Sequence, residues 1–253
     1  MRQLGTQHIL LFRLLRDHFL FLTRSQIERV LTLGTRTANR HLDWLVSEQY
    51  LCRRYRVDSF THFQTPVYYL GRAGWSAAGC LLDDYKKYEH GIAARRERSM
   101  RHLLAVYDVC LKFTLNSTAM QIISADDPIW QKHITFGNVP DCWIQFTGGE
   151  VFVEVDLGRE SLQVVERKFE NYIKFKESGG YRSAFPGCEF RILFIAMTEE
   201  RIETLQRVTS SDDIWFCTMD EFLREPLNLA HWFALRGYYA LPIVRQKEVS
   251  ELQ

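Results

Sequence analysis

The sequence predicts an α/β (α+β) protein in two parts, a small helical domain with a β-hairpin followed by a larger domain on a mixed sheet. Short amphipathic segments of helical spacing fill the first fifty residues and lead into two alternating, strand-like runs. Strand-like and helical runs then alternate over residues 140–217. The chain has 253 residues, 46% of them apolar, which is enough for a sizeable core and excludes wholesale disorder.

Signals for helix ends separate the first three predicted helices. Residues 7–21 have apolar side chains at helical spacing. Thr23 and Gln26 predict a capping box at the start of the second helix, in which each side chain bonds the other residue's backbone N–H. Gly34 is expected to end that helix in the left-handed conformation, and Thr35 is expected to cap the third helix.

The third predicted helix has one apolar and one polar face. Its polar face contains Arg36, Thr37, Asn39 and Arg40. A helix fits the major groove, where Arg bonds guanine and Asn bonds adenine through two hydrogen bonds. Two short helices joined at a glycine turn, the second rich in Arg and Asn, are typical of a helix-turn-helix.

Residues 50–57 and 66–70 predict two strands joined by a polar turn within residues 58–65. The first strand contains Arg53, Arg54 and Arg56. We interpret the hairpin as a wing whose arginines neutralise phosphates, so residues 1–75 are predicted to form a winged helix-turn-helix DNA-binding domain. A small scaffold for protein contacts is the alternative.

Residues 76–94 are predicted to be a connector, and residues 95–225 a second domain that opens with a long helix. After residue 156 we expect a helix from about residue 161 to 176, a buried strand over 190–196, a helix over 199–208 and a strand over 214–217. A further strand is expected within residues 121–123 or 129–136. The aromatic-rich residues 226–253 form a predicted C-terminal cap or tail, and the sequence leaves open whether they pack as a cap or as an interface.

Residues 140–156 contain two alternating runs around Gly148-Gly149, which predict a hairpin with a two-residue turn. In that register Asp141 opposes Asp156 and Trp143 opposes Glu154. The side chains of Asp141, Glu154 and Asp156 then share one face, because side chains alternate with period two.

Like charges that oppose each other destabilise a sheet, so the three carboxylates require a cation. Hard oxygen ligands suit Mg²⁺ or Mn²⁺, which would polarise a phosphoryl oxygen and activate water. Pairing of the carboxylates with Arg159 or Arg167 at a solvent-facing edge is equally open. Lys168 borders the packed face of the next helix and could reach these carboxylates, although an ordinary lysine with its ammonium in water fits the same pattern.

Charge and cysteine content limit the partners. Net charge is only +1, but residues 1–102 contain 17 Lys and Arg against 9 Asp and Glu, whereas residues 103–253 contain 15 against 22. A basic first half suggests a polyanionic partner, with solvated surface charge as the alternative. The six cysteines include no CxxC pair, so we expect a reducing, cytoplasmic location. No apolar run approaches the roughly 18 residues that span a bilayer, so no membrane partner is expected.

The order of elements, with Pro140-Asp141 followed by Glu154-Val155-Asp156, resembles the PD-(D/E)xK fold of restriction-endonuclease-like proteins. The resemblance implies that Asp141 and Glu154 bind a divalent ion beside the scissile phosphate. Asp156 stands where that superfamily has a lysine, and Lys168 is implied as a relocated substitute. The implied catalytic set is Asp141, Glu154, Asp156 and Lys168, and the implied Mg²⁺ or Mn²⁺ ligands are the three acids.

The chain over roughly residues 8–220 is similar to the replication-relaxation family of plasmid and mobile-element proteins. The matching pieces are Leu22-Thr23 with Gln26-Ile27, residues 67–74, Arg101-His102, Pro140-Asp141, Glu154-Val155-Asp156 with Gly158, and Lys168 with Tyr172. The resemblance implies DNA binding in plasmid replication, copy control or mobilisation.

The sequence is compatible with two main functions. The first is a DNA-binding protein whose nuclease-like domain cleaves phosphodiesters with a divalent metal. The second is a non-catalytic replication or transcription regulator, or a relaxosome accessory, that uses the second domain for dimerisation or partner contacts. Double-stranded DNA is the expected partner in both, with a homodimer and replication or mobilisation proteins as further options. A pure protein-interaction module is a weaker third interpretation.

Overall fold

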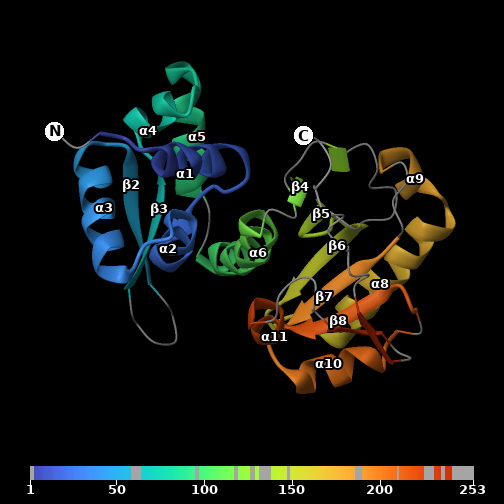
Figure 1. Cartoon of the computed structure of the whole chain (residues 1–253). Coiled ribbons are helices and arrows are strands. Elements are labelled where there is room, and N and C mark those ends of the chain that lie inside the picture. The colour runs from blue at the N-terminus through green and yellow to red at the C-terminus, as the bar shows by residue number, and fades with distance from the viewer. Residues whose placement is uncertain are drawn as a thin grey trace, which may run out of the picture. The chain divides into compact units, whose positions relative to one another are not determined.

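The computed structural model describes residues 3–57, 64–94, 97–116, 119–125, 129–130, 138–146, 149–185, 190–209, 211–224, 231–234 and 237–240. The chain divides into two compact units, Met1–Leu111 and Lys112–Gln253. Helices and sheets occur in both units, which confirms the predicted α+β class (Figure 1). Residues 58–63 of the predicted wing turn and Gly148 of the predicted Gly148-Gly149 turn lie outside the described residues.

Helices pack on a small antiparallel sheet in the first unit. Its elements are α1 (Thr6–Asp17), β1 (Leu22–Thr23), α2 (Arg24–Leu31), α3 (Thr35–Ser47), β2 (Leu51–Val57), β3 (Gln64–Leu70), α4 (Arg72–Ala77), the 3₁₀ turn η1 (Leu82–Asp84), α5 (Tyr85–Ala94) and α6 (Glu97–Leu115), which continues into the second unit. The strand order is β1-β3-β2, and β2 pairs with β3 from Leu51 opposite Leu70 to Val57 opposite Gln64.

The capping box that begins α2 is confirmed. The backbone N–H of Gln26 donates to Thr23 Oγ1 at 3.3 Å, and that of Thr23 donates to Gln26 Oε1 at 2.9 Å. The prediction for Gly34 was wrong, because Thr32 is the left-handed residue, with φ 52°. Helix α2 ends two residues earlier than expected, with the Leu33 N–H bonded to the Glu28 carbonyl. Gly34 then precedes α3 with extended backbone, so it occupies the N-cap that Thr35 was expected to fill.

Residues of the predicted connector pack on the small sheet. The Tyr88 hydroxyl of α5 accepts a hydrogen bond from the Leu70 N–H at 3.0 Å and donates to the Leu20 carbonyl at 3.1 Å. Helix α6 also contributes to this core, since Gln26 Nε2 donates to the Leu104 carbonyl at 2.9 Å. These bonds attach α5 to β3 of the predicted wing and the first part of α6 to α2.

The second unit is built on one mixed sheet of order β10-β9-β8-β7-β6-β5-β4. Its elements are β4 (Ala119–Ser124), β5 (Cys142–Phe146), β6 (Gly149–Asp156), α8 (Leu162–Glu177), α9 (Gly180–Ala184), β7 (Ile192–Ala196), α10 (Glu199–Gln206), β8 (Ile214–Thr218), α11 (Met219–Arg224), β9 (His231–Ala234) and β10 (Gly237–Ala240). Strands β6, β7 and β8 are parallel, and the other neighbours are antiparallel. Strand β4 includes the predicted residues 121–123. Residues 231–240, placed in the predicted cap or tail, contribute two strands that extend the sheet beyond β8.

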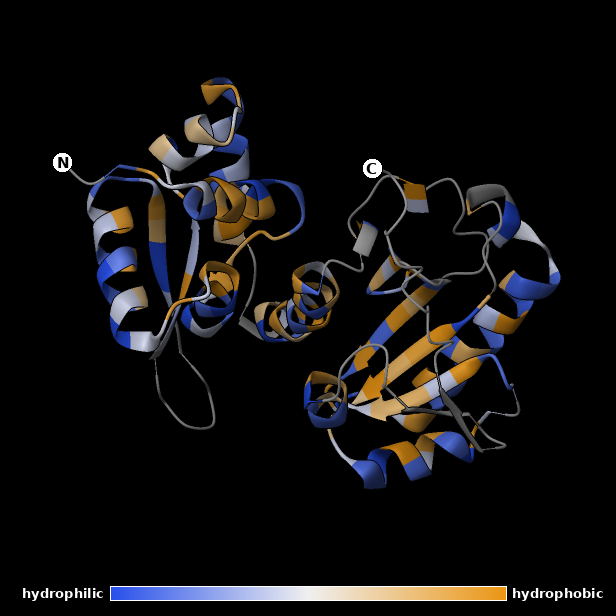
Figure 2. Ribbon diagram, viewed as in Figure 1, coloured by the Kyte–Doolittle hydropathy of each residue, from blue (hydrophilic) through white to orange (hydrophobic). Residues whose placement is uncertain are grey.

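Aromatic side chains fill the core between the sheet and its helices. Phe169 of α8 contacts Phe194 of β7 and Phe216 of β8, with ring centroids 5.3 and 6.1 Å apart. Ile202 and Leu205 of α10 join the same cluster, so α8 and α10 cover one face of the sheet. Figure 2 shows the central strands as predominantly hydrophobic, as expected for strands buried on both sides. Polar groups buried on such strands therefore need specific partners.

Candidate functional site

Helix α3 presents a polar face to solvent. Ala38, Leu42 and Leu45 are buried against the first unit. Arg36, Asn39 and Arg40 are exposed on the other side, and Thr37 is half-buried. This is the division of faces that a helix entering a DNA groove requires.

The three arginines predicted on the wing differ in their surroundings. Arg53 is exposed, with Nη1 3.5 Å from Asp43 Oδ1 of α3, and its guanidinium lies 5.5 Å from the centre of the Tyr55 ring. Arg54 is half-buried and its Nη1 donates to the Ile92 carbonyl at 2.9 Å, so this guanidinium is partly engaged within the protein. Arg56 lies in β2 opposite Thr65, and its side chain lies outside the described residues.

The β5–β6 hairpin brings Asp141 and Glu154 together. The predicted register was wrong by two residues, because Phe146 pairs with Gly149 and Trp143 pairs with Phe152. Since side chains alternate with period two, a two-residue shift leaves every side chain on its predicted face. Asp141 bonds β6 on both sides of Glu154. Its N–H donates to the Val153 carbonyl at 3.0 Å, and its Oδ2 accepts the Val155 N–H at 2.7 Å.

Helix α8 supplies two donors to the Glu154 carboxylate, which is only 1% exposed. Lys168 Nζ lies 3.2 Å from Glu154 Oε2 and 3.0 Å from Glu160 Oε2. The Tyr172 hydroxyl donates to Glu154 Oε1. Lys168 and Tyr172 are four residues apart and so lie on one side of α8. The structure thus joins Asp141, Glu154 and Lys168, three of the four residues in the predicted catalytic set.

Burial and neighbouring charges have opposing effects on the pKa values of Glu154 and Lys168. Burial, and then the negative charge of Asp141, raise the pKa of Glu154 to about 7, although Lys168 and Tyr172 favour the carboxylate. Burial lowers the pKa of the Lys168 ammonium, but Glu154 and Glu160 outweigh it and the net direction is upward. Lys168 lies nearer to water than Glu154, so it loses less hydration. The site therefore combines a permanent cation with a carboxyl group that titrates near neutrality.

Asp156, the third predicted acid, has a different partner. Its Oδ2 lies 2.6 Å from Arg201 Nε of α10, and its Oδ1 accepts the Gly158 N–H at 2.7 Å. Neither Arg159 nor Arg167, the counter-ions considered from the sequence, occupies this place. In the part of the chain that the structure describes, no three His, Cys, Asp or Glu side chains gather closely enough to hold a metal ion. The three acids are thus divided into a facing pair and a separate ion pair.

The donor chemistry of the facing pair fits a hard divalent cation. Asp141 and Glu154 offer carboxylate oxygens, and burial followed by the negative charge of Asp141 raises the pKa of Glu154. A cation between two such groups would relieve their repulsion. Asp141 and Glu154 are therefore the residues that would hold Mg²⁺ or Mn²⁺, and Asp156 does not join them.

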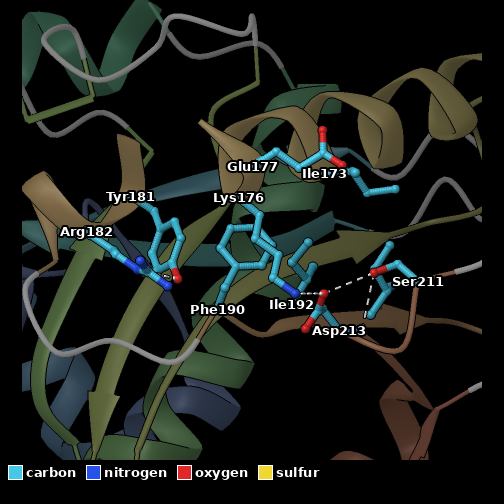
Figure 3. Close-up of a pocket in the computed structure, with 10 residues that line it drawn as sticks. Ile173, Lys176, Glu177, Tyr181, Arg182, Phe190, Ile192, Ser211 and Asp213 are labelled. Carbon is cyan, nitrogen blue, oxygen red and sulfur yellow. Dashed lines mark hydrogen bonds and ion pairs between the residues drawn. The ribbon is translucent and has the colours of Figure 1, made fainter. Parts of the chain in front are cut away.

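A pocket of about 370 Å³ lies elsewhere in the second unit, between α8, α9 and the first residues of β7 and β8 (Figure 3). Tyr181, Phe190 and Ile192 form part of its apolar lining. Lys176 Nζ, on its rim, lies 2.5 Å from Asp213 Oδ2. No residue of the predicted catalytic set lines this pocket, which lies at the opposite end of the parallel strands from Asp156.

The comparisons with known proteins agree with the sequence motifs. Residues 12–187, more than half of the chain, match the family model described as replication-relaxation. No curated protein and no solved structure matches the chain. Among the helices described here, none is long and apolar enough to cross a membrane. The chain therefore belongs to the replication-relaxation family, and this membership indicates a role in plasmid or mobile-element replication or relaxation.

Proposed function

We propose that this protein binds duplex DNA through α3 and the β2–β3 hairpin, and that its second unit is a metal-dependent nuclease domain acting in replication or relaxation. The observation that carries the nuclease part is the contact of Lys168 with the buried Glu154 beside Asp141. A carboxylate pair and a lysine on one face of a sheet are the groups that phosphodiester cleavage requires.

The exposed face of α3 supports the DNA-binding part. Arg36, Asn39 and Arg40 have the side chains that read base edges in the major groove. Arg53 lies beside α3 on the adjoining strand, where a phosphate backbone flanks a helix in the groove. Arg54 is held by the Ile92 carbonyl, so we expect Arg40→Ala to weaken sequence-specific binding more than Arg54→Ala does. Equal losses on specific and random duplex for both variants would contradict these roles.

At the second site each residue has a separable task. Asp141 and Glu154 would hold the divalent ion, which when bound supplies a Lewis acid for the phosphoryl oxygen and lowers the pKa of a bound water. Lys168 keeps its positive charge and would stabilise the negative charge that develops on the phosphate. Tyr172 remains a hydrogen-bond donor, because burial and the charge of Glu154 raise the pKa of its hydroxyl, and it fixes the orientation of Glu154.

A non-catalytic regulator is the second candidate, and two observations favour it. Asp156 stands in place of the superfamily's lysine and is paired with Arg201. Both oxygens of Glu154 already accept bonds from α8. In this alternative the ion pairs stabilise a fold that mediates dimerisation or contacts with replication or mobilisation proteins.

Supercoiled plasmid separates the two candidates. Wild-type protein, Glu154→Ala and the control Glu166→Ala, an exposed residue of α8, are each incubated with plasmid and Mg²⁺ or Mn²⁺. The nuclease proposal expects metal-dependent nicking by wild type and Glu166→Ala, with loss in Glu154→Ala. A gel shift of duplex DNA without nicking would favour the regulator, and absence of any shift at low salt would contradict DNA binding itself.

A further inference from the structure

We propose that Arg201 is a phosphate-binding residue of the candidate nuclease site and that Asp156 is a positioning residue which orients it, rather than a metal ligand. This inference rests on the proposed nuclease function. It gives a role to Arg201 and Asp156, which the PD-(D/E)xK motif leaves unexplained.

The Arg201 side chain is fixed at several points. Its backbone lies in the first turn of α10, where its N–H donates to the capping Thr198 Oγ1 at 3.3 Å. Its Nε donates to Asp156 Oδ2 at 2.6 Å, and its Nη2 donates to the Glu160 carbonyl at 2.8 Å. Nη1 makes no hydrogen bond to any described residue, and the side chain is 17% exposed. One edge of the guanidinium is thus anchored while the Nη1 donors remain for a ligand.

Arg201 lies beside the carboxylate site. Asp156 follows Glu154 by two residues on β6, so both side chains project from the same face of that strand. Glu160 connects the two cations, because Lys168 contacts its carboxylate and Arg201 its carbonyl. Two positive groups from α8 and α10 therefore converge on the end of β6.

The chemistry of the pair explains an acid at the lysine position. A bare aspartate there would repel a phosphate, but a guanidinium bound to that aspartate presents a positive group in its place. Arginine can bind a carboxylate through one edge and a phosphate through another, and it keeps its charge at any physiological pH. Asp156 is matched by its own cation, Arg201, whereas Lys168 contacts Glu154 beside a second acid, Asp141, so a metal ion is expected between Asp141 and Glu154 and not at Asp156.

Two titrations of the full chain test this assignment without measuring nicking. In the first, calorimetry follows binding of Mn²⁺. We expect Glu154→Gln to weaken Mn²⁺ binding about tenfold or more, and Asp156→Asn to change it by less than about twofold, because of these two residues only Glu154 is a proposed ligand. Equal weakening by both variants would overturn the assignment.

In the second titration, calorimetry measures the affinity of each variant for inorganic phosphate, and NMR follows the Arg201 Nε–Hε signal in the proteins that keep this arginine. We expect a saturable shift of this signal in wild type and in the control Arg167→Ala, which replaces an exposed arginine of α8. Phosphate binding should be about tenfold weaker in Asp156→Asn and in Arg201→Ala, because a charge-assisted bond is lost. Asp156→Asn combined with Arg201→Ala should bind no more weakly than Arg201→Ala alone, because Asp156 acts through Arg201. An unchanged wild-type signal, or additive losses, would refute the proposal.

Plasmid nicking separates this inference from the function on which it rests. Phosphate binding at Arg201 without nicking by wild type would contradict the nuclease proposal alone. Nicking that survives in Arg201→Ala at the wild-type rate would contradict only the role given to Arg201.

Discussion

Replacing Glu154 by glutamine should stabilise the second unit at alkaline pH, although it removes a candidate metal ligand. The pKa of Glu154 rises from 4.5 to about 7 because the carboxyl is buried and faces Asp141. Each unit corresponds to about 1.4 kcal/mol, so ionised Glu154 destabilises the fold by about 3 kcal/mol relative to a neutral group of the same shape. Glutamine is that neutral group.

The sign of the pH dependence follows from the direction of the shift. The folded-state pKa is raised, so the favourable contribution of the protonated group is complete below pH 4.5 and is lost as the pH rises to about 7. Wild type and Glu154→Gln should therefore have equal stability near pH 4.5. Their difference should grow through neutrality and reach its full size near pH 8.

Urea unfolding of the full chain measures this difference in stability. Amide hydrogen exchange in β6 and α8 then shows whether the difference arises in the second unit. Glu166→Gln on the exposed face of α8 controls for the loss of one negative charge. A Glu154→Gln variant that is less stable than wild type at pH 8 would show that Lys168 and Tyr172 outweigh burial and the charge of Asp141. A gain independent of pH would equally refute the reasoning.

Three further predictions concern the first unit. Thr23→Ala removes the cap of α2 and should lower the free energy of unfolding by about 1 kcal/mol, measured by urea denaturation, with Thr35→Ala as a control that leaves the cap intact. Arg53→Ala should reduce the salt dependence of DNA binding by about one counterion, and Arg54→Ala by less, as measured by fluorescence anisotropy over a salt series. His8 bonds His41 of α3 at 3.0 Å, and burial followed by the His41 charge lowers its pKa. Stability should thus fall as the pH drops below about 6.5, where only the unfolded chain takes up the proton, and His8→Phe should show a smaller fall.

Local signals in the sequence account for the elements that could be predicted. The capping box at Thr23 and Gln26 depends on residues three apart, and the face of β6 that carries Glu154 depends only on alternation. The approach of Lys168 follows from its position on the border of an amphipathic helix. The class of the protein and its family could be predicted for the same reason, since both rest on the order of such segments.

Contacts between distant segments could not be predicted. Arg201 is 45 residues from Asp156 and no local pattern connects them, although an acid without a counter-ion at the lysine position is itself a signal that one is needed. The hairpin register failed because Gly149 belongs to β6 instead of the turn, a choice that pairing along the whole hairpin decides. The aromatic residues 231–240 gave no indication that they extend the sheet.

Asp141 forms two hydrogen bonds to β6, one on each side of Glu154, so it stabilises the strand pairing as well as being a candidate metal ligand. Alanine at this position would keep the backbone bond to the Val153 carbonyl but lose the side-chain bond from the Val155 N–H, so lost activity would have two explanations. Asparagine keeps an oxygen that can accept the Val155 N–H while discarding the charge. Asp141→Asn is therefore the substitution that separates a loss of metal binding from a loss of strand pairing at this position.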